Sequence, residues 1–480
     1  MTSLPLDLNA VVFERDGRSY LFSGSSLYLF GVDPTTADVV SAARAAGSEA
    51  DLVARTTPVH DPAEVRETLT EIDRLIAADV LAPRGATLRP AGEDPGLTGE
   101  TVALTDLWLI VTNSCNLNCA YCFSRAEYMK DHRPMSIATA KAGVDFLMAR
   151  RGAETELTIV FFGGEPLLDM PLIRAVVAHA DELAARHGLD IQYSMTTNGV
   201  KLTPAVRRWL IEKRFSVMIS LDGEQPQHDA SRPFLSGKGS FSTIVPRVKA
   251  FVAEAKAAGL TVNGRTTLNR THLGHIVDLY RFMDEEMGFS NVSTPIIHEP
   301  APPGFAFRMD DVSALEAELR ALADVFVDKC RTEGRVPRWG TLSTFLHTLH
   351  HRARPARGCA AGRRAVCVDV DGEIYPCERF ITVADYAVGR IGSTAYDMEK
   401  VHALSRLDAV GYYDKCRSCA AVYYCKGTCA AERARYHPPE GPDEITCEIY
   451  RALLRVVLDI YVRIDHDALL PSLMRHDRAA

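Results

Sequence analysis

Between residues 107 and 333, six apolar strand-like runs alternate with helical runs, and this alternation constrains the fold more than any other feature. The expected strands are LWLIVT, LTIVFF, IQYSMTT, VMISL, TVNGRTTL and NVSTPII, and the expected helices cover residues 136–150, 171–187, 203–213, 242–258, 272–287 and 311–333. Strands that alternate with helices form a parallel sheet covered by helices. The fold class is therefore α/β, an open or closed barrel with its chemistry in the loops after the strands.

Several polar or cysteine-containing motifs follow these strands. Cys115, the GGEP of residues 163–166, the TTNG of 196–199 and the SLDG of 220–223 all lie at or just beyond an expected strand's carboxyl end. Because the carboxyl ends of parallel strands meet at one face of a barrel, these motifs are expected to share one site.

The rest of the chain divides around this barrel, expected at residues 104–335. Residues 1–83 read as a small α/β unit: an alternating stretch VVFERDGRSYLF, a turn, a second strand SLYLFGV, and helices, the last of them capped by Asp61. Residues 84–103 are rich in Pro and Gly and are expected to be a linker. Residues 336–480 lose the strand-helix rhythm and gain cysteines, which is typical of a unit organised by metal.

The chain contains twelve cysteines, and two groups hold all but Cys330. Three lie within eight residues, and eight more fall between Cys359 and Cys447. The N-terminus lacks a basic start and a continuous apolar stretch, so the chain is expected to be cytoplasmic, with reduced thiols available to bind metal. A net charge of −8 gives no support for nucleic-acid binding, and no apolar run approaches the roughly 20 residues that span a membrane.

The first cysteine group, Cys115, Cys119 and Cys122, lets one loop bring three thiolates to one cluster. This Cys-x3-Cys-x2-Cys loop, with Tyr121 before the third cysteine, resembles the radical S-adenosylmethionine (SAM) superfamily. The resemblance implies a 4Fe-4S cluster whose fourth iron binds SAM and whose electron cleaves it to a 5'-deoxyadenosyl radical. A structural zinc site is the alternative, but zinc takes four ligands and the nearest histidine is His132.

The same resemblance implies further contacts to SAM. GGEP, whose glycines permit a close backbone approach to a ligand, matches the motif that holds the amino group of SAM. Asn198 and Ile297 are weaker candidates, for which a strand-end cap or a core contact is as good an interpretation. The implied contacts are Tyr121, Gly163, Gly164, Glu165, Asn198, Ser220, Arg232 and Ile297.

The second cysteine group resembles the seven-cysteine pattern of the SPASM domain of radical SAM peptide-modifying enzymes. That resemblance implies two auxiliary 4Fe-4S clusters, so three clusters in all. Cys359, Cys377 and Cys429 are assigned to the nearer auxiliary cluster, and Cys416, Cys419, Cys425 and Cys447 to the farther one. A zinc ribbon formed by the pairs at 416–419 and 425–429 is the alternative.

The sequence is compatible with two roles for each of two further residues in this region, Cys367 and Glu378. Cys367 either completes the nearer cluster or is a buried thiol. Glu378, directly after Cys377, matches an acidic residue that some family members are proposed to use as a proton acceptor, and a surface salt bridge is equally compatible with its position.

Residues 1–83 resemble PqqD-like domains, which bind the leader segment of a precursor peptide. The resemblances together imply a partial (β/α)6 TIM-like barrel with an N-terminal PqqD-like peptide-recognition domain and a C-terminal SPASM domain. The segments FFGGEPLL, TTNGV, SLDG and RPFLSGKGSF look most like thioether-forming maturases, either of Cys-rich peptides or of the small subunit of quinohemoprotein amine dehydrogenase. The implied partners are a precursor peptide or small subunit and an electron donor such as flavodoxin or ferredoxin.

Two other functions remain open at the level of sequence. One is anaerobic sulfatase-type formylglycine formation, which uses similar domains without a leader-binding unit. The other is a metal-stabilised peptide-binding protein that catalyses no reaction.

Overall fold

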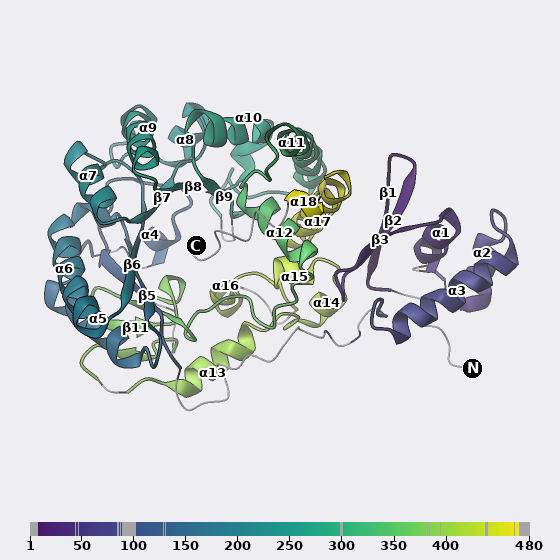
Figure 1. The fold of residues 1–480 in the computed structure, drawn as a ribbon, viewed down its shortest axis with the longest axis horizontal. Coiled ribbons are helices and arrows are strands. Elements are labelled where there is room, and N and C mark those ends of the chain that lie inside the picture. The colour runs from purple at the N-terminus through teal and green to yellow at the C-terminus, as the bar shows by residue number, and fades with distance from the viewer. Residues whose placement is uncertain are drawn as a thin grey trace.

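The structure, a computed structural model (Figure 1), describes residues 8–83 except 44 and 47, residues 86 and 88, residues 102–297 except 128 and 130, residues 301–436 except 382, 384 and 394, and residues 440–469 except 465. Most of the predicted linker 84–103 lies outside these residues. Within them, no helix has both the length and the apolar character needed to cross a bilayer.

One nine-stranded sheet organises the centre of the molecule, in the order β12-β11-β10-β4-β5-β6-β7-β8-β9. Strands β4 to β9 pair in parallel in chain order, as the six-fold alternation predicted. They are β4 (Asp106–Thr112), β5 (Glu156–Gly163), β6 (Asp190–Thr197), β7 (Ser216–Ser220), β8 (Val262–Arg265) and β9 (Asn291–Ser293).

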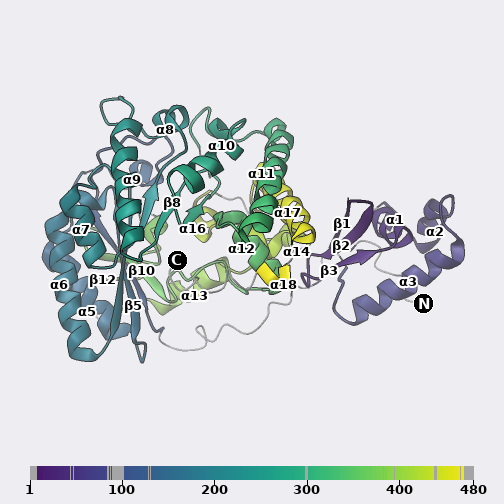
Figure 2. The same cartoon turned by 45° about the horizontal axis from the view of Figure 1, so that its top comes forward.

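Helices cover the outer face of this curved sheet (Figures 1 and 2). They are α5 (Ile137–Arg150), α6 (Met170–His187), α7 (Pro204–Glu212), α9 (Phe241–Ala257), α10 (Ile276–Arg281) and α11 (Val312–Glu333), with the short α4 (Phe123–Glu127) and α8 (Gln225–Ser231) in loops. The helix expected at 272–287 is shorter, because α10 gives way to a π-helical turn at Phe282–Glu286. The last two strands are also shorter than predicted.

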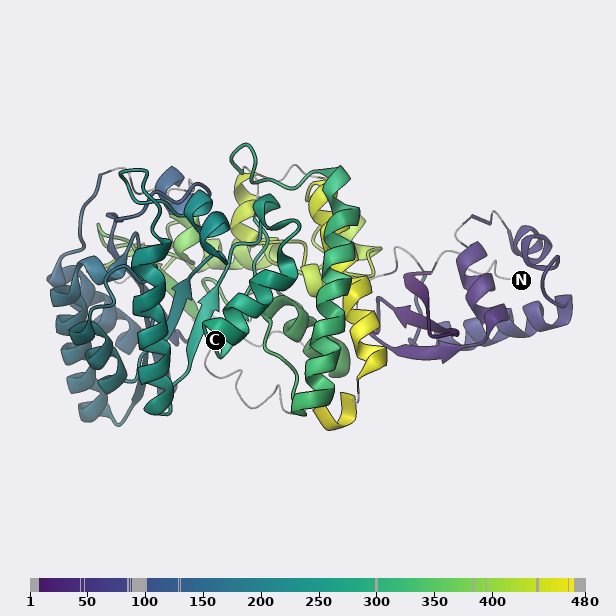
Figure 3. The ribbon, with the colours of Figure 1, turned by 90° about the horizontal axis from the view of Figure 1, so that it is seen from above.

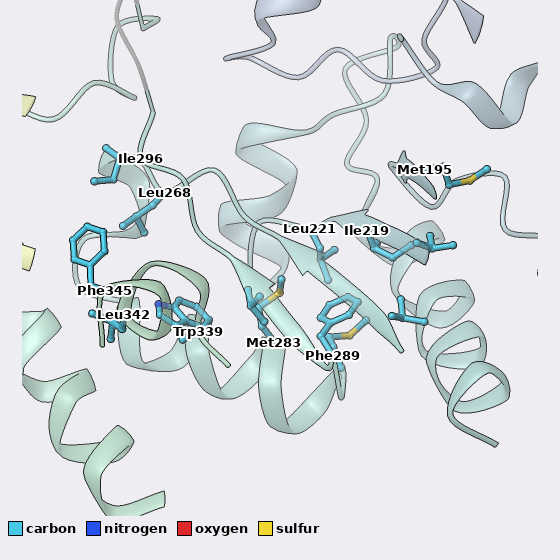
Figure 4. Packing of buried hydrophobic residues seen from close by; sticks show 14 of the residues in the cluster. Met195, Ile219, Leu221, Leu268, Met283, Phe289, Ile296, Trp339, Leu342 and Phe345 are labelled. Atoms are coloured by element: carbon cyan, nitrogen blue, oxygen red, sulfur yellow. The ribbon is translucent and has the colours of Figure 1, made fainter. Parts of the chain in front are cut away.

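The two faces of strands β6 to β9 have opposite character. Met195, Val217, Ile219, Val262 and Val292 point to the helices and belong to the main hydrophobic core, part of which Figure 4 shows. The alternate side chains must point to the inside of the barrel, because successive side chains of a strand point to opposite faces. The outer face therefore stabilises the fold and leaves the inner face for a site.

The sheet does not end at the predicted boundary between residues 335 and 336. Strand β10 (Ala365–Val368) pairs in parallel with β4, and β11 (Glu373–Tyr375) and β12 (Gly389–Arg390) follow in antiparallel order. This C-terminal region also contains α12 (Gly340–His350), α13 (Met398–Leu407), α14 (Asp414–Arg417), α15 (Val422–Cys425), α16 (Ala430–Arg435), α17 (Glu444–Arg463) and α18 (His466–Leu469). Helix α17 runs beside α11 (Figure 3), and Arg455 pairs with Glu316 across them.

The N-terminal unit forms a three-stranded antiparallel sheet, β1 (Ala10–Arg15), β2 (Arg18–Ser23) and β3 (Leu29–Val32), packed against α1 (Pro34–Ala43), α2 (Glu49–Thr56) and α3 (Pro62–Ala77). The stretch expected as one strand is a hairpin, because Asp16 and Gly17 both adopt positive φ and turn the chain. Asp61 caps α3 as predicted, accepting a hydrogen bond from the Ala63 amide at 2.6 Å.

This unit lies at one end of the molecule and contacts the cysteine-rich region (Figure 3). The Phe22 and Tyr424 rings lie 6.4 Å apart, and Arg15 pairs with Asp459 at 3.1 Å. A Cβ at Gly24 would lie 2.5 Å from the Cα of Ala420, so only glycine permits this approach. The N-terminal sheet therefore rests on the segment between Cys419 and Cys425.

Candidate active site at the mouth of the barrel

The loop that carries Cys115, Cys119 and Cys122 follows β4 and is held in place by backbone contacts with residues 231–234. The Asn118 amide donates to the Pro233 carbonyl at 2.8 Å and the Ala120 amide to the Ser231 carbonyl at 2.9 Å. Because the partner segment follows α8, the loop is fixed by a distant part of the barrel.

The three thiols of this loop lie within electrostatic range of one another. Burial raises the pKa of Cys115 to about 11 and that of Cys119 to about 12, and neighbouring thiols of the loop add to both shifts. Such thiols keep their protons until a metal displaces them, so binding of a metal releases protons.

A zinc ion and a four-iron cluster would require different arrangements of these thiols. Four zinc ligands converge on one point, with sulfur about 2.3 Å from the metal. Within the described ranges, no three His, Cys, Asp or Glu side chains are grouped so as to hold one metal ion. The thiolates of a four-iron cluster bind different irons and need no such convergence, so three thiols on one loop fit that group.

Gly163 and Gly164 hold the GGEP turn against the start of the cysteine loop. A Cβ at Gly164 would lie 2.1 Å from the Ser114 carbonyl oxygen, and one at Gly163, whose φ is +127°, would lie 2.6 Å from the Thr112 oxygen. These glycines were expected to permit a close approach to a ligand. In this structure they permit a close approach to the chain's own backbone at Thr112 and Ser114.

Glu165 joins the turn to the end of β6. Its carboxylate, 1% exposed, accepts hydrogen bonds from the Thr197 hydroxyl at 2.6 Å and the Asn198 amide at 2.8 Å. Burial raises the pKa of Glu165, although these hydrogen bonds oppose the shift.

Asn198 reaches back to the cysteine loop. Its Nδ2 donates to Asn116 Oδ1 at 2.7 Å and lies 3.8 Å from the Cys115 sulfur. Asn116 Nδ2 is buried and has no hydrogen-bond partner among the residues described. An unsatisfied donor beside Cys115 fits a site that receives a polar ligand such as SAM.

Tyr121 and Arg232 meet at a carboxylate that the sequence did not single out. Asp222, fully buried, accepts a hydrogen bond from the Tyr121 hydroxyl and lies 3.1 Å from Arg232 Nε. Arg232 also donates to the Cys119 sulfur at 3.7 Å. The position of Asp222 inside the quoted SLDG motif was the available signal, but only the fold brings it to Arg232.

Ser220 begins a polar row across the inner face of the barrel. It pairs in register with Arg265 of β8, which in turn pairs with Ser293 of β9. Ile297 lies near this end of the sheet, packed against the core, and its amide donates to the Leu268 carbonyl at 2.8 Å. Arg265 was missed because a short strand of mixed polarity carries no signal of which face it exposes.

The cysteines of the C-terminal region fall into two groups. The pKa of Cys377 is raised by burial and also by Glu378, Cys429 and Cys359, which places these three thiols together. Burial raises the pKa of Cys416 to about 11, with contributions from Cys419 and Cys447, and that of Cys425 to about 12, with contributions from Cys416 and Cys419. The structure thus groups Cys359, Cys377 and Cys429, and separately Cys416, Cys419, Cys425 and Cys447.

Cys367 stands apart from both groups. It is fully buried in β10, and the groups that affect its pKa after burial are Glu378 and Asp369 rather than another thiol. It packs with Ile110, Met129 and Ile381.

Glu378 lies between the barrel and the group that contains Cys377. Burial raises its pKa, and the charges of Arg379 and Arg265 oppose the shift. Arg265 is also in electrostatic range of Tyr121 and Arg232. Arg265 is therefore within electrostatic range of both Glu378 and the residues Tyr121 and Arg232, and the described residues give Glu378 no ion pair.

A parallel α/β barrel with a three-cysteine loop after its first strand defines the class of radical SAM enzymes. Comparison with known proteins agrees: residues 109–283 match the Radical SAM superfamily. This match and the relatives described below identify the chain as an enzyme, so the non-catalytic interpretation is removed.

Two relatives illustrate the similarity in sequence. A cysteine-type anaerobic sulfatase-maturating enzyme of Clostridium novyi is 24% identical over 355 residues, covering 71% of this chain and 91% of the relative. The radical SAM cyclopropyl synthase TigE of Paramaledivibacter caminithermalis is 22% identical over 389 residues, covering 75% of each.

Two solved structures share the fold. That of anSMEcpe with bound AdoMet has a TM-score of 0.64 at 19% identity and covers 76% of this chain and 99% of its own. Streptococcus suis SuiB bound to S-adenosylmethionine has a TM-score of 0.50 at 15% identity and covers 91% of this chain and 98% of its own.

Proposed function

We propose that this enzyme forms sulfur-to-carbon thioether cross-links in a ribosomally made precursor peptide or small protein subunit. The observation that carries the proposal is the separate N-terminal sheet that rests on a cysteine-rich region with two groups of thiols. The anSMEcpe structure aligns over 99% of its own length with only 76% of this chain, so this chain has additional parts.

The N-terminal unit is proposed to be a PqqD-like domain that binds a leader segment. Among the described residues β3 pairs only with β2, which leaves one edge of the sheet for an added strand. An extended peptide that adds to a sheet edge gains main-chain hydrogen bonds. Its contact with the cysteine-rich region would fix the leader relative to the barrel.

A peptide substrate has support from a relative of known structure. The anSMEcpe protein has been solved with bound AdoMet and the Cp18Cys peptide. By analogy, the mouth of this barrel is proposed to receive the reacting segment of a peptide, while the leader stays on the N-terminal sheet.

Three 4Fe-4S clusters are proposed, one on each group of thiols. Cys115, Cys119 and Cys122 would hold the first, which would supply an open iron for SAM and the electron for its cleavage. Gly163, Gly164, Glu165 and Ser220 line the SAM site, with Arg232 and Asp222 holding Tyr121 in the loop. The proposed electron donor is a flavodoxin or ferredoxin.

The proposed reaction balances as follows. A hydrogen atom leaves a substrate carbon and ends in 5'-deoxyadenosine, with methionine as the second product of SAM. The substrate sulfur then bonds to that carbon, its thiol proton passes to a base, and one electron passes to an acceptor. Glu378 is the proposed proton acceptor, because it directly follows Cys377 and lies within electrostatic range of Arg265 on the inner face of the barrel. The two auxiliary clusters are suited to accept the electron.

Formylglycine formation is the second candidate, and the similarity to sulfatase-maturating enzymes over 71% of the chain favours it. The two products differ chemically. Formation of a thioether removes two hydrogens from the peptide and consumes a thiol. Formation of formylglycine from cysteine instead releases the sulfur and leaves an aldehyde.

Anaerobic co-expression with the short peptides encoded beside the gene tests the proposal. We expect mass spectrometry to find a product that has lost hydrogens, retains all its sulfur, and has fewer thiols open to alkylation. Cys115→Ala is the inactive control. An enzyme lacking residues 1–83 should release 5'-deoxyadenosine but fail on the full-length precursor. An aldehyde that reacts with hydrazide would instead establish formylglycine formation.

A further inference from the structure

An ion pair between a partly buried arginine and a buried glutamate lies beside the proposed site of the nearer auxiliary cluster. Arg379 Nη2 is 2.9 Å from Glu432 Oε1, and their side chains are 25% and 3% exposed. Arg379 follows Cys377 by two residues, and Glu432 follows Cys429 by three, with its amide donating to the Cys429 carbonyl at 3.0 Å. The pair therefore connects the two segments that supply two of the proposed ligands.

The same guanidinium also contacts the SAM-cluster loop. It lies over the ring of Phe123, 4.9 Å from the ring centroid, in the geometry of a cation–π contact. Phe123 directly follows Cys122. One positive charge thus lies between the proposed SAM cluster and the proposed nearer auxiliary cluster, within electrostatic range of Cys377 and Cys429.

A second arginine also joins the two segments that carry this pair. Arg435 of α16 donates from Nη2 to the Arg379 carbonyl at 3.2 Å and to the Ile381 carbonyl at 2.5 Å, so its side chain links α16 to the turn after Cys377 independently of the pair. Replacing a buried ion pair by apolar side chains is often neutral or stabilising. The stability that the pair adds therefore does not explain why charges lie here, whereas their position beside Cys377 and Cys429 suggests an electrostatic role.

We propose that Arg379 and Glu432 set the reduction potential of the iron–sulfur cluster held by Cys359, Cys377 and Cys429. Cluster potentials depend on nearby charge, hydrogen bonds and exposure to solvent. Reduction adds one negative charge, which Arg379 stabilises and Glu432 opposes. The inference rests on the proposed function, in which this cluster accepts the electron released when the thioether forms. The pair would set how readily the cluster accepts that electron.

An EPR-monitored redox titration of full-length protein tests the inference. All variants are made in the background Cys115→Ala, Cys119→Ala, Cys122→Ala, which removes the SAM-binding cluster, and the farther cluster serves as internal reference. Arg379→Met should lower the midpoint potential of the nearer cluster so that the ratio of reduced to oxidised cluster at a fixed potential falls about tenfold, a shift of about 59 mV for one electron. Glu432→Gln, nearly identical in shape, should raise it. Arg379→Lys retains the charge and should stay near the parent value.

Midpoint potentials that shift in opposite directions in Arg379→Met and Glu432→Gln distinguish an electrostatic role from a structural one. Looser packing alone would not shift the two potentials in opposite directions. Shifts of the same sign, or no shift in Glu432→Gln, overturn the inference. If Arg379→Met does not retain the cluster, the isosteric Glu432→Gln decides alone. Iron and sulfide analysis of the parent protein shows whether the nearer cluster is present. A parent without that cluster would contradict the proposed function, whereas a parent with the cluster but without the expected shifts would contradict only this inference.

Discussion

Arg232 Nε lies 3.1 Å from Asp222 Oδ2, and this ion pair joins the end of β7 to the segment that holds the SAM-cluster loop. The Arg232 side chain is 9% exposed and that of Asp222 is fully buried. Arg232 reaches onward to the Cys119 sulfur, and Tyr121 donates to the same carboxylate. The position of the loop therefore depends on a buried charge network as well as on its cysteines.

Asp222→Asn should destabilise the protein, because it leaves the Arg232 guanidinium buried without a full counter-charge. Breaking a buried pair from one side costs about 3–5 kcal/mol. Denaturant unfolding of the full chain measures this loss. The exposed pair of Arg186 and Glu182 is the matched control, and Glu182→Gln should cost about 1 kcal/mol or less. Equal losses in both variants would contradict a special role for the buried pair.

His228 should make stability depend on pH. Burial lowers its pKa to about 4, well below the ordinary value of 6.5. Its Nδ1 accepts a hydrogen bond from the Asp222 amide at 3.3 Å, and its Nε2 bonds to the Ser240 hydroxyl at 3.0 Å, so a second ring proton would face a donor. Between pH 6.5 and about 4 the unfolded chain binds more protons at this residue than the folded one. The folded state therefore loses stability as the pH falls through that window.

The comparison of wild type with His228→Gln isolates this effect from other titrating groups. Above pH 6.5 the difference in unfolding free energy between the two proteins should be constant. Below it the wild type should lose up to about 3 kcal/mol relative to the variant, at about 1.4 kcal/mol per pKa unit. A difference that does not change between pH 7 and pH 4.5 would falsify the assignment.

How far the sequence predicts the structure depends on how local the signal is. The six strand-helix units, the Asp61 cap and the position of the cysteine loop follow from hydrophobic periodicity and short motifs, which act over a few residues. The pairing of β10 with β4 joins residues about 260 positions apart in the chain, and no local pattern carries it. The hairpin at Asp16 and Gly17 did have a local signal, the Asp-Gly pair, which was read as part of one strand.

The same distinction holds within the candidate site. The cysteines and the glycines of GGEP could be named from spacing, because their chemistry is written in short motifs. Asp222, Arg265, Arg379 and Glu432 could not, since a charged residue on a strand or turn carries no signal of the partner that the fold brings to it. The buried charges were therefore the part of the site that only the structure revealed.

Cys367→Ala should retain the iron of the reconstituted protein, because Cys367 lies apart from both groups of C-terminal thiols. Cys359→Ala and Cys377→Ala should each lose iron from the proposed nearer auxiliary cluster. Iron and sulfide analysis under anaerobic conditions measures the difference. Loss of iron in Cys367→Ala equal to that in Cys377→Ala would make Cys367 a ligand of that cluster instead.

Gly164→Ala should displace the cysteine loop, because the new methyl group would lie 2.1 Å from the Ser114 carbonyl oxygen and backbone must move to admit it. We expect a loss of SAM-dependent 5'-deoxyadenosine release of at least about tenfold, the effect of misplacing reacting groups by about 1 Å. Gly31→Ala is the matched control, since its methyl group would meet no atom nearer than 3.9 Å. Gly31 lies in the N-terminal sheet, so Gly31→Ala should release 5'-deoxyadenosine at the normal rate. Gly164 lies on the turn that touches Ser114, and a normal rate in Gly164→Ala would show that this turn does not fix the position of the SAM cluster.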